Sequence, residues 1–105
     1  MIASLIRDEA ASVSQQLVKL YKAEKIILFG SAVKNPELAN DLDFLILKSD
    51  VPDQGLERMH QVRSLITKKL AADFLILTPL EFEQRKRLND PFILNIINTG
   101  RVLYG

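Results

Sequence analysis

The sequence predicts an α/β domain in which helices flank a small sheet. Short runs of aliphatic and aromatic residues, typical of buried strands, alternate with longer stretches whose apolar residues recur at spacings of three and four. The chain has 105 residues, the size of one domain with a modest core. We therefore expect residues 1–105 to form a single domain.

The first part of the chain is expected to supply a long helix and a strand. Residues 2–22 predict an amphipathic helix with one apolar stripe toward the core. The stripe consists of Ile2, Leu5, Ile6, Val13, Leu17, Leu20 and Tyr21. The β-branched and aromatic run 25–29 predicts a buried strand that ends at Gly30. Residues 31–34 predict a short helix capped by Ser31.

The middle of the chain predicts two more strands joined by a helix. Residues 42–48 form the second expected strand, and its side chains alternate between two faces. One face carries Leu42, Phe44 and Ile46, and the other carries Asp41, Asp43, Leu45 and Leu47. After a loop at 51–55, residues 56–71 predict a helix and residues 72–77 a third strand. The core positions expected on that helix are Leu56, Met59, Val62, Ile66 and Leu70.

The last part predicts two helices and a final extended segment. The run Thr-Pro-Leu-Glu at 78–81 is a helix start, in which threonine caps, proline takes the first turn and glutamate completes a capping box. That helix is expected to run to about Leu88, and another to span 91–98. Residues 101–104 predict an extended segment. Both tyrosines, Tyr21 and Tyr104, are expected to pack.

Composition narrows the possible chemistry. A net charge of +1 gives no general attraction to nucleic acid or to an anionic membrane. The chain has no cysteine and one histidine, His60, which is expected on the surface. Any metal must therefore be held mainly by oxygen, which favours Mg²⁺ or Mn²⁺ over Zn²⁺. Since no apolar run approaches the roughly 20 residues of a membrane span and the first residues do not read as a signal peptide, we expect a cytoplasmic protein.

Three aspartates form the candidate metal site. Side chains two apart on a strand point the same way, so Asp41 and Asp43 face one site. Two carboxylates this close repel each other unless a cation lies between them. The text L-D-F-L-I-L around Asp43 recurs as A-D-F-L-I-L around Asp73, so the two aspartates would be adjacent if the strands pair in register. Such a triad can hold two metal ions roughly 3.5–4 Å apart, as in phosphoryl transfer.

A Gly-Ser turn is the candidate phosphate site. Nine residues separate Ser31 from Asp41. Gly30 has no Cβ, so its backbone can approach a phosphate closely. Amides at the start of the following short helix, together with the Ser31 hydroxyl, can bind terminal phosphates. Lys34, one turn further on, can add positive charge beside a leaving pyrophosphate.

With these motifs in this order, the sequence resembles the minimal nucleotidyltransferases of the DNA polymerase beta superfamily. Their pattern is G-S, a loop of about ten residues, D-x-D and a third carboxylate on a later strand. Gly30, Ser31, Asp41, Asp43 and Asp73 match it. The resemblance covers nearly the whole chain, including T-P-x-E and the final G-R-V-L-Y-G. It implies the minimal fold of that superfamily, a small mixed sheet flanked by helices.

The resemblance also implies a function. Such proteins are typically encoded beside a HEPN-domain ribonuclease toxin and neutralise it by transferring AMP from ATP to one of its tyrosines. In that scheme Asp41 and Asp43 bind two Mg²⁺ ions, and Asp73 binds the catalytic ion and helps deprotonate the tyrosine. Gly30 and Ser31 hold the β- and γ-phosphates. The expected assembly is a hetero-oligomer with the toxin, without a membrane or direct contact with nucleic acid.

Three positions depart from the commonest pattern of that family. The loop is one residue shorter, Lys34 stands where arginine is usual, and Asn40 where serine is common. Two alternatives therefore stay open. One is an antitoxin that neutralises its partner by binding alone, with an idle site. The other is transfer to a small molecule or RNA, although relatives with those substrates carry extra domains. The basic run Arg85-Lys86-Arg87 is interpreted as a solvated helix face rather than as an RNA-binding patch.

Overall fold

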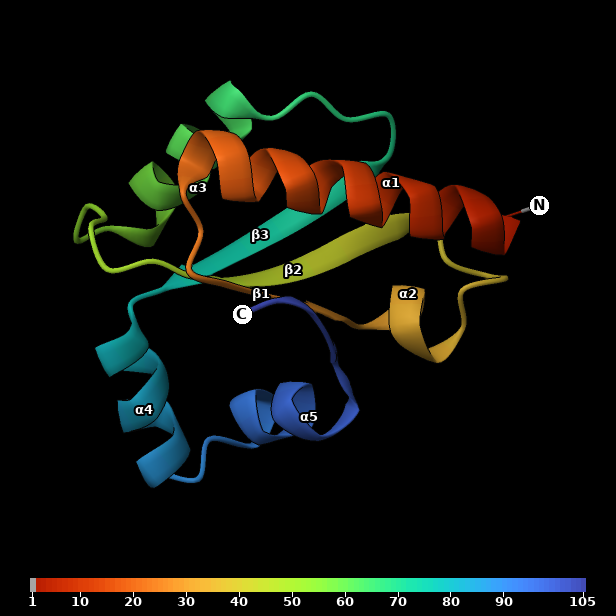
Figure 1. The fold of residues 1–105 in the computed structure, drawn as a ribbon. Helices are drawn as coiled ribbons and strands as arrows, with labels where there is room; N and C mark the ends of the chain where they lie inside the picture. The colour runs from red at the N-terminus through yellow and green to blue at the C-terminus, as the bar shows by residue number, and fades with distance from the viewer. Residues whose placement is uncertain (1) are drawn as a thin grey trace.

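Helices and strands alternate along the chain, as expected for an α/β domain (Figure 1). A computed structural model describes residues 2–105, with the side chain of Ile2, predicted to belong to the apolar stripe, outside the described part. The elements are α1 (Ile2–Gln16), η1 (Leu17–Tyr21), β1 (Lys25–Phe29), α2 (Ser31–Lys34), β2 (Asp41–Leu47), α3 (Gly55–Leu65), β3 (Ala71–Leu77), α4 (Pro79–Arg87), α5 (Pro91–Thr99) and β4 (Arg101–Tyr104).

The four strands form one mixed sheet in the order β3-β2-β1-β4. β2 and β3 run parallel, because α3 and the loops beside it carry the chain back to the starting end of the sheet. β1 pairs antiparallel with both β2 and β4. In this register Asp43 lies opposite Asp73 on one side and opposite Phe29 on the other. The predicted adjacency of Asp43 and Asp73 is confirmed.

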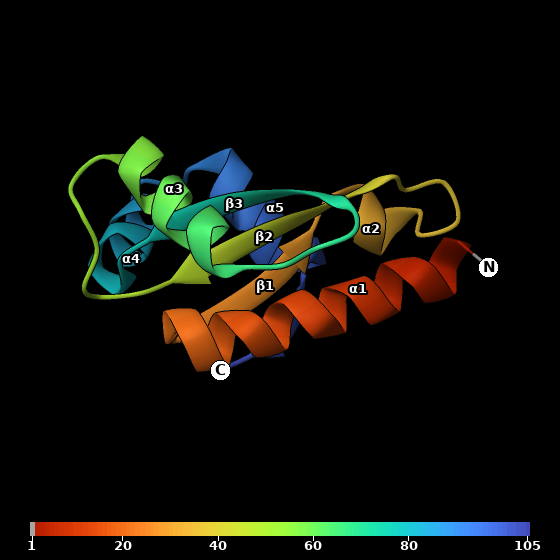
Figure 2. The same cartoon turned by 90° about the horizontal axis from the view of Figure 1, so that it is seen from above.

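Helices cover both faces of the sheet. α1 and α3 lie on one face, and α4 and α5 lie on the other (Figure 1). Viewed from above, α1 runs along the β1 side of its face and α3 along the β3 side (Figure 2). The predicted alternation of β2 is confirmed, since its two sets of apolar side chains belong to different cores. Leu42, Phe44 and Ile46 pack toward α1 and α3, and Leu45 and Leu47 pack toward α4 and α5.

The long first helix is confirmed, and its last turn is π-helical. Ile6, Val13, Leu17 and Tyr21 are buried along one face. The prediction was wrong for Leu5 and Leu20, which are 62% and 53% exposed. Consecutive residues of a helix point about 100° apart, so burial of Ile6 and Tyr21 turns the neighbouring leucines away from the core.

The helix predicted at 56–71 ends early, at Leu65. Residue 66 is already extended, and the segment after it is held along α1 by side chains. Gln16 accepts a hydrogen bond from the amide of Thr67 (2.7 Å) and donates one to its carbonyl (2.8 Å). The buried carboxylate of Glu9 accepts from the amides of Lys69 and Leu70. These long-range contacts give the segment hydrogen-bond partners that it would lose if the helix continued through it.

The predicted core face of α3 is correct only in part. Val62 is buried, and Met59, Ile66 and Leu70 pack against the core while partly exposed. The prediction was wrong for Leu56, which is 60% exposed. Arg58 is buried instead, because its guanidinium finds acceptors beneath the helix. His60 is exposed, as expected.

The C-terminal elements agree closely with the prediction. The hydroxyl of Thr78 accepts from the Glu81 amide and the Glu81 carboxylate accepts from the Thr78 amide, so the capping box is present. The side chain of Asp90 caps α5, and the helix ends at Gly100. Tyr21 packs as predicted, but Tyr104 on the edge strand is 44% exposed, so the prediction for it was wrong. Each helix within residues 2–105 is too short or too polar to span a lipid bilayer.

Candidate functional site

The three aspartates gather at one end of the central strands. Asp41 and Asp43 lie two apart on β2, on the face that α4 and α5 cover, and Asp73 is level with Asp43 on β3. Burial raises the pKa of the Asp43 carboxyl, and the negative charges of Asp41 and Asp73 raise it further. Asp41 and Asp73 therefore lie close enough to Asp43 for their charges to act on its carboxyl.

The Gly-Ser turn lies directly against this acidic group. Gly30 follows β1, has a φ of +77°, and is the N-cap of α2. A Cβ placed on Gly30 would lie 2.5 Å from Oδ2 of Asp43. Glycine is thus required both by the positive φ and by the proximity of the carboxylate. The predicted phosphate turn and the predicted metal ligands are neighbours in space.

Ser31 does not cap the short helix, contrary to the prediction. Gly30 occupies the N-cap position, and its carbonyl accepts hydrogen bonds from the amides of Val33 and Lys34. Ser31 is the first residue of α2, and its side chain is exposed. Lys34 ends the helix and is exposed as well. Both side chains are accessible to a ligand at the turn.

Asp73 is held somewhat apart from the other two carboxylates. Its side chain is 73% exposed and lies 3.7 Å from a guanidinium nitrogen of Arg63. Among residues 2–105, no three Asp, Glu, His or Cys side chains are grouped so as to hold a metal ion together. Asp41 and Asp43 supply the hard oxygen donors that Mg²⁺ prefers, so the residues fit such an ion in part. A third carboxylate ligand requires the exposed side chain of Asp73 to turn from Arg63 toward Asp43.

A shallow pocket of about 500 Å³ opens beside the carboxylates. Asp43 and Asp73 line it together with Phe29, Leu75, Arg85 and Phe92. The rings of Phe29 and Phe92 meet edge to face, with centroids 5.7 Å apart, and Phe92 is 49% exposed. Met59 and Phe74 complete the lining, which therefore combines acidic and basic groups with aromatic and apolar side chains.

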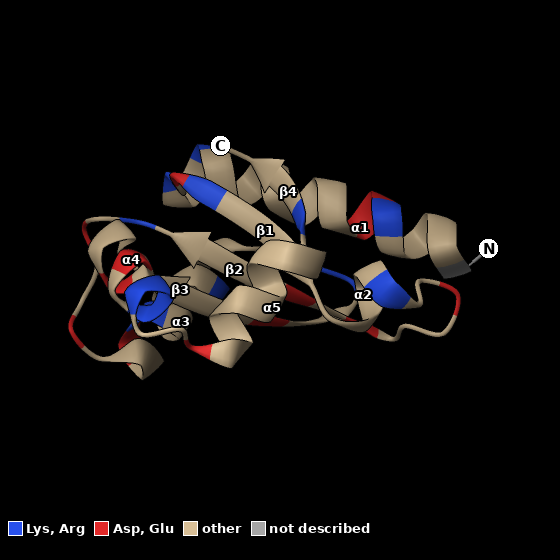
Figure 3. Ribbon diagram, turned by 90° about the horizontal axis from the view of Figure 1, so that it is seen from below, with Lys and Arg blue, Asp and Glu red and all other residues tan. Residues whose placement is uncertain are grey.

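Apart from Asp43 and Asp73, the residues that line this pocket were not singled out from the sequence as site residues. Phe92 follows the Asp90-Pro91 start of α5, and Arg85 belongs to the basic run read as a solvated helix face. Figure 3 shows α5, which carries no charged side chain, beside the basic end of α4. The only local signal for Phe92 was an aromatic residue in the first turn of a helix, directly after the Asp90-Pro91 start.

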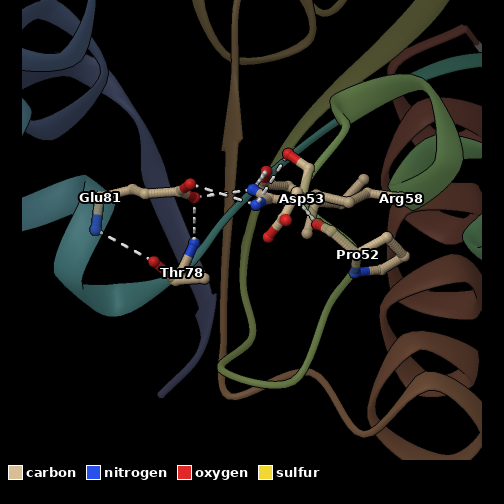
Figure 4. Close-up of polar contacts among 6 residues, drawn as sticks. Pro52, Asp53, Arg58, Thr78 and Glu81 are labelled. Atoms are coloured by element: carbon tan, nitrogen blue, oxygen red, sulfur yellow. Dashed lines mark hydrogen bonds and ion pairs between the residues drawn. The ribbon is translucent and has the colours of Figure 1, made fainter.

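An ion pair that is buried on its arginine side joins elements around the site, apart from the three aspartates. Arg58 of α3 is 5% exposed, and its guanidinium binds both carboxylate oxygens of Glu81 at 2.7 and 3.1 Å (Figure 4). It also donates to the carbonyls of Pro52, Asp53 and Ile76. The hydrogen bonds from Arg58 hold the pKa of Glu81 at about 2. This pair joins α3, the end of β3 and the start of α4, and was not expected from the sequence.

A second hollow, of about 450 Å³, lies on the opposite face of the sheet, between α1, α2 and β4. Its walls are mostly apolar, with Arg7 and Arg101 among them, and it includes none of the predicted site residues.

Comparison of the chain with protein-family models, with curated proteins and with solved structures finds no match. The fold is an α/β domain with a four-stranded mixed sheet flanked by helices.

Proposed function

We propose that this protein is a magnesium-dependent nucleotidyltransferase that uses the Gly-Ser turn and the aspartates of β2 and β3. The main support is the close approach of Gly30 to Asp43, which sets a turn suited to phosphate against carboxylates suited to a divalent cation. The alignment of Asp43 with Asp73 supports it further. Together they provide, in one place, the two recognition elements that a nucleoside triphosphate needs.

The residues would divide the work as follows. Asp41 and Asp43 would hold Mg²⁺, with Asp73 as a third ligand, and the bound ion would neutralise phosphate charge during transfer. Gly30, Ser31 and Lys34 would bind the β- and γ-phosphates. The acceptor oxygen bonds to the α-phosphorus, and the bond from that phosphorus to the bridging oxygen breaks. Pyrophosphate leaves with the electron pair, and Asp73 accepts the hydroxyl proton.

The resemblance of the motifs supports a specific substrate and partner. It favours ATP as the nucleotide and a tyrosine of a HEPN-domain toxin as the acceptor, so that the protein acts as an antitoxin by adenylylation. This assignment places the protein in the cytoplasm, where ATP is available, and in a complex with the toxin.

One observation favours a second candidate function. The ion pair of Asp73 with Arg63 leaves two carboxylates, rather than three, directed at the site. A protein of this kind with an idle site would neutralise its partner by binding alone. The two candidates differ in whether AMP is added to the partner.

Intact-mass spectrometry of a HEPN-domain protein as the proposed partner distinguishes them. The partner is incubated with the protein, ATP and Mg²⁺, and with Asp43→Asn in parallel. Asp50→Asn, at an exposed loop position, serves as the matched control. We expect mass increments of AMP with the wild type and the control but not with Asp43→Asn. A stable complex without any increment would refute catalysis and support neutralisation by binding.

A further inference from the structure

The second hollow, between α1, α2 and β4, reaches into the main core of the protein. Four of the side chains that line it are at most 6% exposed and belong to that core: Ile6, Ala10, Leu28 and Ala32. α2 lies beside the N-terminal part of α1 in both views of the ribbon (Figures 1 and 2). Sites for small molecules are typically concave, ~300–1,000 Å³ in volume and mostly apolar, with a few polar groups. At about 450 Å³, the hollow has the size and the composition of such a site.

The walls of the hollow suit an aliphatic chain. Small side chains keep the space between the two helices open: Ala3, Ala10 and Ala11 on α1 and Ala32 on α2. None of the described residues that line the hollow is aromatic, so it offers no surface on which a ring would stack. A chain of methylene groups needs no such surface, because it is stabilised simply by the removal of its apolar area from water.

Two arginines lie at the hollow without an ionic partner. Arg7 of α1 and Arg101, the first residue of β4, both line it, and both are exposed. The ion pairs present among residues 2–105 involve other arginines and lysines. Guanidinium groups bind carboxylates in a planar, bidentate geometry. The hollow therefore combines an apolar interior with two positive charges that an anionic group on a ligand can neutralise.

A buried hydroxyl adds a third group to the hollow. Ser14 lines it two turns along α1 from Arg7, is 8% exposed, and makes no side-chain hydrogen bond within the part of the chain that the structure describes. The hydroxyls of Ser64 and Thr99, by contrast, donate to carbonyls three and four positions earlier. A buried polar group without a partner costs free energy, which a ligand can recover by supplying the partner. Seven positions along an α-helix correspond to roughly 10 Å, which sets the distance between that partner and the anionic group.

We propose that the hollow binds a linear aliphatic carboxylate whose far end carries a hydroxyl group. Arg7 and Arg101 hold the carboxylate at the mouth, the chain packs against Ala10 and Leu28, and the far hydroxyl forms a hydrogen bond with Ser14. The binding is non-covalent, and the site lies on the face of the sheet opposite the aspartates. It is independent of the proposed nucleotidyltransferase function, so either can fail without the other.

Titrations followed by NMR test the site with four probes. Octanoate carries the charge and the chain, and 8-hydroxyoctanoate adds the far hydroxyl. Octan-1-ol has the chain without the charge, and acetate has the charge without the chain. Dissociation constants are taken from the shifts of the backbone amides of Ala10, Ala32 and Leu103, which line the hollow, and the amide of Phe92 in the other pocket is the reference. We expect octanoate to bind at the hollow and acetate to bind far more weakly.

The arginines are tested by removal of their charges. Arg7→Gln and Arg101→Gln should each weaken the binding of octanoate about tenfold, the effect of losing a hydrogen bond to a charged group. The binding of octan-1-ol should change little. Arg87→Gln, at an exposed position of α4 outside the hollow, is the matched control and should bind octanoate as the wild type does.

Two other substitutions test the interior. The wild type should bind 8-hydroxyoctanoate more tightly than octanoate, and Ser14→Ala should abolish that difference while binding octanoate as before. Ala11→Leu, which narrows the hollow from an exposed position, should weaken the binding of both; Ser12→Leu, exposed and outside the hollow, is its control. Circular dichroism establishes that each variant is folded, and the two substitutions test the interior separately if one of them is not.

Other results would overturn the inference. Equal binding of acetate and octanoate would reveal only an anion site on the surface. Equal weakening of octan-1-ol and octanoate by Arg7→Gln would show that the arginine shapes the hollow without binding the charge. Shifts confined to Phe92, or no shifts at all, would rule out a ligand in the hollow, and equal affinity for octanoate and 8-hydroxyoctanoate would refute the role of Ser14. Binding to phosphatidylglycerol vesicles that is lost in Arg7→Gln, without any response to octanoate, would assign this face to a membrane surface instead.

Discussion

Replacement of Glu81 by glutamine should separate the contribution of its ion pair with Arg58 to stability from that of the capping box. Glutamine keeps a side-chain oxygen that can accept from the amide of Thr78, so the cap survives. It lacks the charge that faces the guanidinium of Arg58 across 2.7 and 3.1 Å. The substitution therefore removes the charge of Glu81 and changes the rest of the helix start little.

The pKa of Glu81 sets the size of the effect. It lies at about 2, against an ordinary value of 4.5. The difference corresponds to about 3 kcal/mol at about 1.4 kcal/mol per pKa unit. Because 39% of the Glu81 side chain is exposed, solvent screening reduces this figure, and Arg58 keeps its three carbonyl acceptors. We expect Glu81→Gln to cost about 2 kcal/mol at pH 7, below the roughly 3–5 kcal/mol for breaking a fully buried pair.

The pH dependence provides a second, independent check. The folded protein holds the pKa of Glu81 below its unfolded value, so the pair stabilises the fold fully above about pH 4.5. That stabilisation is lost as the pH falls from there toward 2, because the carboxylate becomes protonated. The difference in unfolding free energy between wild type and Glu81→Gln should therefore shrink between pH 7 and pH 3.

Urea denaturation followed by circular dichroism measures both effects. Thr78→Ala, which removes the other half of the capping box, is the matched control and should cost about 1 kcal/mol with no comparable change between pH 7 and pH 3. A Glu81→Gln variant as stable as the wild type at pH 7 would contradict a stabilising charge on Glu81. A deficit that is undiminished at pH 3 would contradict it equally.

Three further substitutions test the site and its supports. Gly30→Ala should destabilise the fold by about 1–3 kcal/mol, because alanine is strained at a φ of +77° and its Cβ would meet Asp43; Gly55→Ala, in open space, is the control in the same urea titration. Asp43→Asn should raise the melting temperature at pH 7, because burial and the charges of Asp41 and Asp73 raise the Asp43 pKa and so make its charged form unfavourable. That gain should vanish below the unfolded pKa, and a lower melting temperature at pH 7 would contradict it. Glu9→Ala should cost about 1–3 kcal/mol by leaving the amides of Lys69 and Leu70 without their acceptor. Faster hydrogen exchange at Leu70 would confirm it, and unchanged exchange would argue against it.

Most of the fold could be predicted because its signals are local. Runs of apolar residues marked the strands, and turn and capping residues marked where helices begin. Periodicity does not give the width of the buried face of a helix. Leu5 and Leu20 were therefore wrongly assigned to the core, although both are exposed. Arg58 is buried in place of Leu56 because Ile76 and Glu81 supply acceptors for its guanidinium. These acceptors lie 18 and 23 positions away in the sequence. No local pattern records such a contact.

The candidate site could likewise be predicted only where its signals lie in the local sequence. The repeated text around Asp43 and Asp73 was sufficient to predict their register, since parallel neighbours with the same alternation align their equivalent residues. Phe92 and Arg85 reach the pocket only because α4 and α5 fold back over the sheet. The ion pair of Asp73 with Arg63 likewise depends on where α3 lies against β3.

The order of the strands has a consequence for how this chain folds. β1 joins β2 across a short connection but joins β4 from the far end of the chain, and Lys25 reaches Gly105 across 80 positions. Closing a loop of that length costs more chain entropy than any other pairing in the sheet. We expect a nucleus of β1, β2 and β3, with the edge strand docking last, as non-local contacts generally do. The strands that carry the aspartates, and the one that leads into the Gly-Ser turn, would then be assembled before the sheet is complete.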